Sequence, residues 1–161
     1  DCTFKPPPLP EPVRLVDLML SQVCQCDTTY QRTHHMIGYV ILGTNDLPRA
    51  RSFYDALLAE MGVTRMMEFG ARGSAWAAAM DKPMLCIMTP YDGKPATVGN
   101  GVMAGIAVDS RATVDRMHKK ALELGGTDEG PPGLRGEGGE GFYAAYFRDL
   151  DGNKLDVYHY G

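Results

Sequence analysis

The feature that most limits the fold of this chain is an internal repeat. Two apolar segments, residues 37–42 and 102–108, are each followed by a helical pattern that ends at a glycine. Tyr39 and Met103 stand 64 positions apart, and Gly62 and Gly125 stand 63 apart. Because two separate landmarks share nearly one offset, we expect two similar modules, residues 36–98 and 99–161.

Both helical patterns have recognisable starts. Asp46 followed by Pro48 predicts the start of the first helix, and Ser110 predicts the start of the second. Apolar residues then recur every three or four positions, which predicts one buried face on each helix. These residues are Ala50, Phe53, Tyr54, Leu57, Leu58 and Met61 in the first helix, and Val114, Met117, Ala121 and Leu122 in the second.

Short β-prone segments follow each helix. In the first module they are residues 63–69, 74–79 and 84–89; in the second they are a short strand near Thr127, then residues 142–147 and 154–160. Asp151-Gly152-Asn153 predicts a hairpin turn between the last two. The predicted fold is therefore α+β, with two βαβββ modules that form a curved mixed sheet around a concave cleft for a small molecule.

Residues 1–35 have a different composition from the rest. They contain no glycine or alanine and five of the 11 prolines, whereas all 19 glycines follow Met36. We expect an N-terminal appendage, either upstream-encoded or foreign to the domain, joined to a paired domain of residues 36–161. The proline run favours an extended, polyproline-like backbone.

Charge and cysteine content exclude several kinds of partner. The net charge of −4 argues against a general nucleic-acid or anionic-membrane binder, and no apolar run is long enough to span a bilayer. The four cysteines, Cys2, Cys24, Cys26 and Cys86, lack the spacing of a zinc or thioredoxin motif. They are typical of free thiols, and we expect a cytoplasmic protein.

Two segments carry a family resemblance. The opening residues 37–47 with Arg51-Ser52-Phe53-Tyr54, and the closing residues 146–157 around the Asp151-Gly152-Asn153 turn, resemble the vicinal oxygen chelate superfamily. This superfamily includes glyoxalase I, bleomycin resistance proteins and extradiol dioxygenases. The resemblance covers residues 36–161 and implies a homodimer, in which modules are sometimes exchanged between chains.

The resemblance also implies where a metal ion would bind. Family enzymes place a histidine on the first strand of each module and a carboxylate on the last. Carried over by motif, these positions are Tyr39 and Met103, then Cys86 and Asp156. Neither histidine is present, and one aspartate cannot hold a divalent cation alone, so we expect a metal-free site without a cofactor. A soft metal on Cys86 and Met103 is the weaker alternative.

Strand alternation predicts which side chains line the cleft. Asp156, with Tyr39, is the candidate catalytic acid or base; alternatively, Asp156 binds a ligand amine or pairs with a cation. The predicted ligand contacts are Trp76, Cys86, Met88, Met103, Arg135, Tyr143 and Tyr158. Core filling is the alternative for Trp76 and for the two methionines.

Three further residues complete the sequence predictions. Arg135 lies in the glycine-rich residues 125–141, which we interpret as a flap from which it meets an anionic ligand or stays solvated. His118 is expected on the helix surface, and His159 is expected to face away from the cleft. No serine or cysteine nucleophile paired with a histidine is recognisable.

The sequence thus supports three functions. The first is a small-molecule binding protein of the glyoxalase and bleomycin resistance type, with a degenerate metal site and an apolar or aromatic ligand. The second is a metal-dependent lyase, isomerase or dioxygenase of the same superfamily. The third is a cleft that serves as a regulatory or protein-binding surface. The sequence leaves open whether any reaction is catalysed.

Overall fold

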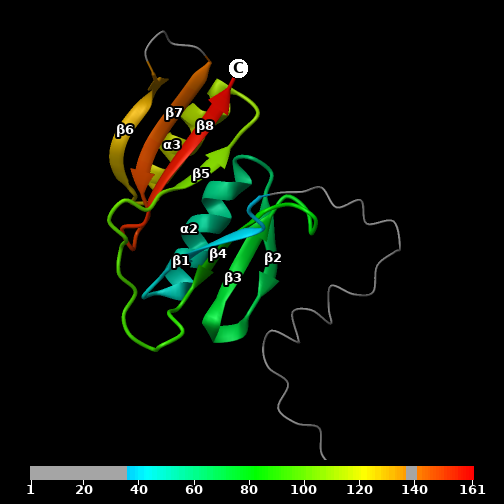
Figure 1. The fold of residues 1–161 in the computed structure, drawn as a ribbon, viewed down its shortest axis with the longest axis vertical. Helices are drawn as coiled ribbons and strands as arrows, with labels where there is room; N and C mark the ends of the chain where they lie inside the picture. Colours follow the sequence, from blue (N-terminus) through cyan, green and yellow to red (C-terminus); the bar gives the residue numbers. More distant parts are fainter. Residues whose placement is uncertain (1–35, 137–140) are drawn as a thin grey trace, which may run out of the picture. The chain divides into compact units, whose positions relative to one another are not determined.

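A computed structural model of the protein describes residues 36–136 and 141–161 (Figure 1). The first module comprises β1 (Tyr39–Gly43), α2 (Leu47–Ala59), β2 (Thr64–Glu68), a 3-10 helix η1 (Gly70–Arg72), β3 (Gly73–Ala77) and β4 (Met84–Met88). The second comprises β5 (Ala104–Ala107), α3 (Arg111–Glu123), β6 (Thr127–Leu134), β7 (Phe142–Arg148) and β8 (Lys154–Tyr160). The order confirms an α+β fold with two βαβββ modules. The predicted appendage, residues 1–35, lies outside the described residues.

Each module forms its own four-stranded mixed sheet. The strand orders are β1-β4-β3-β2 and β5-β8-β7-β6. In both sheets the first strand of the module runs parallel to the last, and the other pairs are antiparallel. Because the two sheets share one topology, the repeat seen in the sequence is a repeat of structure.

The helices begin and end where the sequence predicts. The Asp46 side chain accepts a hydrogen bond from the Arg49 amide at 3.0 Å, and Ser110 accepts one from the Thr113 amide at 3.2 Å. Each bond satisfies an amide that the first helical turn leaves free. Gly62 and Gly125 follow the helices with φ of 74° and 94°, a conformation that glycine adopts without strain.

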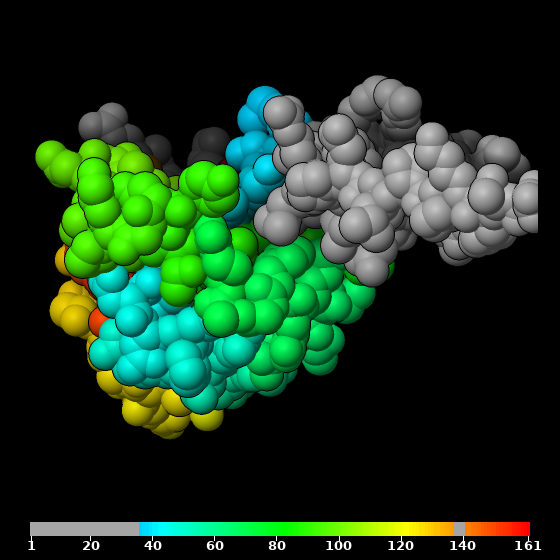
Figure 2. All heavy atoms as spheres, turned by 90° about the horizontal axis from the view of Figure 1, so that it is seen from below, coloured from blue at the N-terminus to red at the C-terminus, as the bar shows by residue number. Residues whose placement is uncertain are grey.

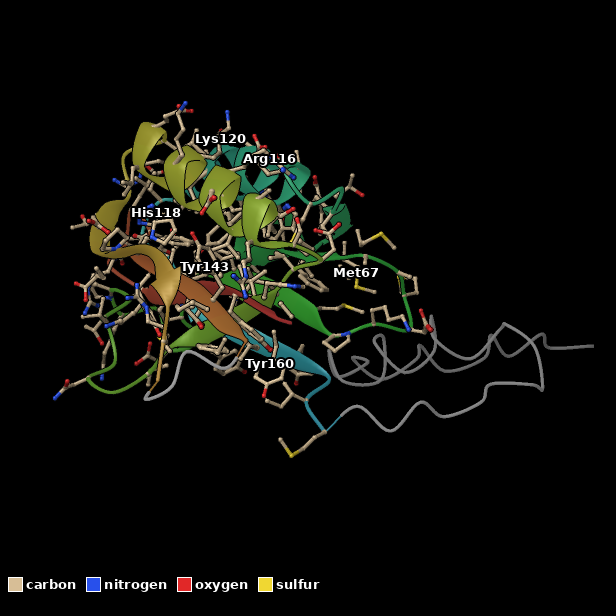
Figure 3. All side chains as sticks on the ribbon, turned by 90° about the horizontal axis from the view of Figure 1, so that it is seen from above. Met67, Arg116, His118, Lys120, Tyr143 and Tyr160 are labelled. Atoms are coloured by element: carbon tan, nitrogen blue, oxygen red, sulfur yellow. The ribbon has the colours of Figure 1, made fainter. Side chains whose placement is uncertain are left out.

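The two helices share one hydrophobic core. Both lie on the same side of the sheets, as Figures 1 and 3 show. Tyr54 of α2 and Trp76 of β3 are buried with ring centroids 5.7 Å apart, and Met117 of α3 joins the same cluster. Glu60, directly after α2, pairs with Lys120 of α3 at 3.6 Å. No helix among the described residues is long and apolar enough to cross a membrane.

The buried face of α3 differs from the prediction at two positions. His118, expected on the surface, is 5% exposed, and its Nε2 lies 3.0 Å from Asp128 Oδ1. It stands four positions after Val114 and three before Ala121, so helix geometry turns it inward. Leu122, expected in the core, is 36% exposed. The pKa of Asp128 is lowered, chiefly by a hydrogen bond from the Gly130 amide and to a smaller extent by one from His118.

Strand β6 is longer than the short strand predicted near Thr127. It runs to Leu134 and pairs with β7 across two register shifts, at Gly130 and Gly133. Much of the segment that we interpreted as a flap is therefore strand, because its backbone hydrogen-bonds to β7. Residues 137–140 of that segment lie outside the described residues.

A carboxylate in the β7–β8 turn joins the modules. Asp149, 6% exposed, accepts hydrogen bonds from the Tyr54 hydroxyl at 2.7 Å and from the backbone amides of Asp151 and Asn153 at 3.0 and 2.8 Å. The turn then reaches the end of β1. Asn153 donates to the Gly43 carbonyl at 2.9 Å, and the Asp151 carboxylate accepts from Thr44 at 2.7 Å.

We expect Tyr54→Phe to lower the free energy of unfolding by about 1.5–3 kcal/mol, because it removes a hydrogen bond to a buried charged group. Urea unfolding of the purified chain measures the change. Tyr91→Phe is the control. Tyr91 is 90% exposed, so removal of its hydroxyl should change the free energy of unfolding by less than about 0.5 kcal/mol. Equal stabilities for the two variants would contradict this role of Asp149.

Candidate functional site

In the described part of the chain, the helices cover one face of each sheet and no helix covers the other, which we call the open face. The first open face belongs to the first module, where Ile41 pairs with Cys86 and Gly43 with Met88. The second open face belongs to the second module, where Asp156 lies between Gly105 and Tyr146. The first open face comprises Tyr39, Ile41, Cys86 and Met88, and the second comprises Gly105, Ala144, Tyr146, Asp156 and Tyr158.

Asp156 is the most unusual side chain of the second open face. It is 4% exposed, and its Oδ1 is buried without a hydrogen-bond partner. A Cβ atom at Gly105 would lie 2.8 Å from that oxygen and 3.3 Å from the Tyr158 ring, so glycine makes room for the carboxyl group. Burial raises the pKa of Asp156, because the charged form loses its water.

Arg135 contributes a cation to the same face. Its guanidinium carbon lies 5.2 Å from the centre of the Tyr146 ring, and Nη2 donates to the carbonyls of Pro131 and Ala144. Its Nε is buried without a partner. Lys154 Nζ lies 5.8 Å from the centre of the same ring. The Tyr146 ring thus stands between a buried carboxyl group and two cations.

Tyr146 was not among the site residues predicted from the sequence. The Asp151-Gly152-Asn153 turn carries the signal that would have found it. A hairpin centred at Asp151 pairs positions equally distant from it, and the structure pairs Tyr146 with Asp156. Tyr158, which we did predict, stacks on Phe142 with ring centroids 5.2 Å apart.

The first open face is apolar and more exposed. Tyr39 and Ile41 are 63% and 55% exposed, whereas Cys86 is 8% exposed and burial raises the pKa of its thiol. Met88 is half-buried on the same face. Met103 directly precedes β5 and is 46% exposed.

Trp76 and Tyr143 lie on the helix-covered faces instead of the open ones. Trp76 Nε1 donates to Asp55 of α2 at 2.8 Å. The Tyr143 hydroxyl donates to Asp115 of α3 at 2.9 Å, and Figure 3 shows its side chain toward that helix. Trp76 therefore takes the core alternative. His159 faces away from Asp156, as predicted, with Nδ1 3.0 Å from the Val108 carbonyl.

The four positions that correspond to family metal ligands do not fit a divalent cation. They offer the phenol of Tyr39, the thioether of Met103, the buried thiol of Cys86 and the single carboxyl of Asp156. The described residues contain no group of three or more His, Cys, Asp or Glu side chains placed to share an ion. Divalent cations need several oxygen, nitrogen or thiolate ligands, so this donor set is too weak.

Two shallow cavities lie away from the predicted residues. One of about 430 Å³ is lined by residues that include Asn45, Arg72, Tyr91 and Lys94. There the segment after β4, light green in Figure 2, lies against the start of α2, and the Asn45 side chain hydrogen-bonds with Ala96. The other, of about 420 Å³, lies between the end of α2 and the start of α3. Neither is lined by a predicted site residue.

Comparisons with known proteins agree on one group. The family model described as the Glyoxalase/Bleomycin resistance protein/Dioxygenase superfamily matches residues 36–157. The chain is 37% identical to a glyoxalase/bleomycin resistance protein from Albidiferax ferrireducens T118, and the match covers 79% of this chain and 100% of that one with a TM-score of 0.71. A comparison with curated proteins found no match.

More distant structures share the fold alone. Lactoylglutathione lyase from Agrobacterium tumefaciens is 21% identical over 76% of this chain and 91% of that one, with a TM-score of 0.56. A glyoxalase/bleomycin resistance protein/dioxygenase family enzyme from Burkholderia phytofirmans PsJN is 16% identical over 75% and 95%, with a TM-score of 0.59.

Asp156→Asn should change stability in a pH-dependent way. Because the pKa of Asp156 is raised in the folded chain, wild-type stability falls as pH rises through that pKa. We expect the variant to be more stable by about 1–3 kcal/mol at about pH 7 and equal to wild type at about pH 4. Urea unfolding at both pH values tests this.

Asp92→Asn is the control, since the Asp92 side chain is 57% exposed. It should show no pH-dependent gain. An Asp156→Asn variant that is less stable than wild type at neutral pH would contradict the picture of a desolvated, unpartnered carboxyl group.

Proposed function

Because the chain belongs to the glyoxalase/bleomycin resistance protein/dioxygenase superfamily, we propose that it binds a small organic molecule at the second open face, around Asp156, without a metal ion. The ligand is apolar or aromatic and carries a group that hydrogen-bonds to the carboxyl. A cytoplasmic location, and the absence of nucleic-acid and membrane partners, stay predictions from the sequence.

The observation that carries the proposal is the unpartnered Asp156 carboxyl. A buried polar group without a partner costs about 1–3 kcal/mol, and a ligand that supplies the partner recovers that free energy. The surroundings suit an organic ring, because the aromatic side chains of Tyr146 and Tyr158 stand beside the carboxyl on the same face. Ligand sites are typically apolar with a few placed polar groups.

Asp156 is also the residue that would carry any proton transfer. A raised pKa lies closer to neutral pH, where a carboxyl group is a more effective general acid or base. Tyr39 is the proposed second catalytic residue, and its phenol stands on the first open face. Tyr39 and Asp156 can act on one ligand only if the first open face of one chain covers the second open face of another.

We propose that a second copy of the chain provides this cover. The first open face and the residues that lead into β1 expose large apolar side chains, Met36, Ile37, Tyr39 and Ile41, each at least half exposed. Such patches mark interaction surfaces. The charges on the second open face decide which two faces pair in the dimer.

The second open face carries Arg135, Arg148 and Lys154, so two copies of it would repel each other across a two-fold axis. If the first open face of each chain covers the second open face of its partner, the repulsion is avoided and two equivalent sites form.

The metal-free proposal predicts that purified protein contains far less than one equivalent of transition metal per chain by elemental analysis. Aromatic ligands should raise the unfolding temperature equally with and without a chelator. A ligand at 100 times its Kd adds about 2.7 kcal/mol to the free energy of unfolding. A stoichiometric metal ion, or binding that the chelator abolishes, would favour the metal-dependent alternative.

The dimer proposal is tested with Ile41→Lys, which places a charge in the apolar first open face. We expect wild type to run in light-scattering chromatography at twice the 17.6 kDa chain mass, and the variant to run as a folded monomer with at least about tenfold weaker ligand binding. Leu122→Lys on α3, at a position 36% exposed, should remain dimeric. A monomeric wild type that still binds ligand would refute the need for a second copy.

A further inference from the structure

The second open face is positively charged within a chain whose net charge is −4. Among the described residues, its charged side chains are the cations Arg135, Arg148 and Lys154 and the carboxyl groups of Glu129 and Asp156. Arg148 and Lys154 both pair with Glu129, at 2.7 and 3.1 Å. In the part of the chain that the structure describes, three cations therefore stand against two carboxyl groups, and the excess remains even when Asp156 is ionised.

The excess charge is centred on Arg135. Within the described part of the chain, its guanidinium contacts carbonyl oxygens and an aromatic ring rather than a carboxylate. These contacts do not neutralise its charge, and Nε is left without an acceptor. Within residues 36–136 and 141–161, Arg135 is thus a cation without a paired carboxylate.

The Arg135 side chain is also held in place. Nη2 donates to the carbonyls of Pro131 and Ala144, which fixes the end of the side chain against the sheet. Tyr146 supports the guanidinium plane. A guanidinium fixed in this way binds a planar anion with little further loss of conformational entropy.

From these contacts we infer that the ligand is an organic anion, an aromatic-sized carboxylate whose charge pairs with Arg135 while a second polar group hydrogen-bonds to Asp156. This inference rests on the proposed function and names its ligand class. Tyr146 is opposite Asp156, roughly 5 Å away across the strands, and the guanidinium lies over its ring.

A cationic ligand fits the same face less well. An ammonium group beside Asp156 would gain one carboxylate but would meet Arg135 and Lys154 on the far side of Tyr146. Like charges in a partly desolvated site repel strongly. The charge distribution therefore favours an anion over an amine.

The test uses the full chain and three aromatic probes, para-hydroxybenzoate, phenol and benzylamine, with Kd measured by ligand-observed NMR at millimolar concentration. We expect para-hydroxybenzoate to bind most tightly. Arg135→Gln should weaken it at least about tenfold and leave phenol unchanged, because only the carboxylate loses its charged partner. Arg135→Lys, which keeps the charge without the planar fork, should lose less.

Arg72→Gln is a matched control. Arg72 of η1 also stacks on a tyrosine, with its guanidinium carbon 5.2 Å from the centre of the Tyr91 ring, but it belongs to the first module. Its replacement should change none of the three Kd values. Thermal unfolding of each variant establishes that a loss of binding is not a loss of folding.

The outcomes separate the inference from the function on which it rests. If phenol or benzylamine binds as tightly as para-hydroxybenzoate, or if Arg135→Gln leaves the carboxylate probe unaffected, the anion assignment is wrong while small-molecule binding stands. If none of the probes binds wild type, the proposed aromatic-ligand function fails, and the anion assignment fails with it.

Discussion

The structure depends on one buried carboxylate, that of Asp149. It accepts hydrogen bonds from Tyr54 and from two amides of its own turn, and so fixes the position of Asp151 and Asn153. Those two side chains bind the end of β1, at Thr44 and Gly43. Because this network joins the second sheet to the first helix, α2 and α3 share one core and both open faces lie on the side away from the helices.

Most of the fold could be predicted because its signals are local. Asp46, Ser110, Gly62 and Gly125 set the helix ends by hydrogen bonds and backbone angles that lie within a few residues. His118 was misplaced because polarity was weighed above spacing, and the partner that stabilises its burial, Asp128, lies on another element. The extent of β6 was missed because prolines and glycines conceal its pairing with β7.

The candidate site was partly predictable for a related reason. The family motif gave Tyr39, Cys86 and Asp156 as anchors, and alternation along the strands extended each open face from them to neighbours such as Ile41 and Met88. Alternation could not place Trp76, since every residue of β3 is buried, or Tyr143, since β7 carries aromatic residues on both faces. The unpartnered atoms of Asp156 and Arg135 are products of tertiary packing, and no sequence pattern contains them.

The joining network also makes the two halves of the repeat unequal. In the first module the corresponding turn, residues 78–83, has no Asp-x-Asp-Gly-Asn segment, and its Asp81 pairs with the adjacent Lys82. A protein built from two second modules would keep the carboxylate turn twice, whereas one built from two first modules would have none. The turn of the second module finds its partners Tyr54, Thr44 and Gly43 in the first, so the two halves are complementary and a chain made of either half twice would lose this connection.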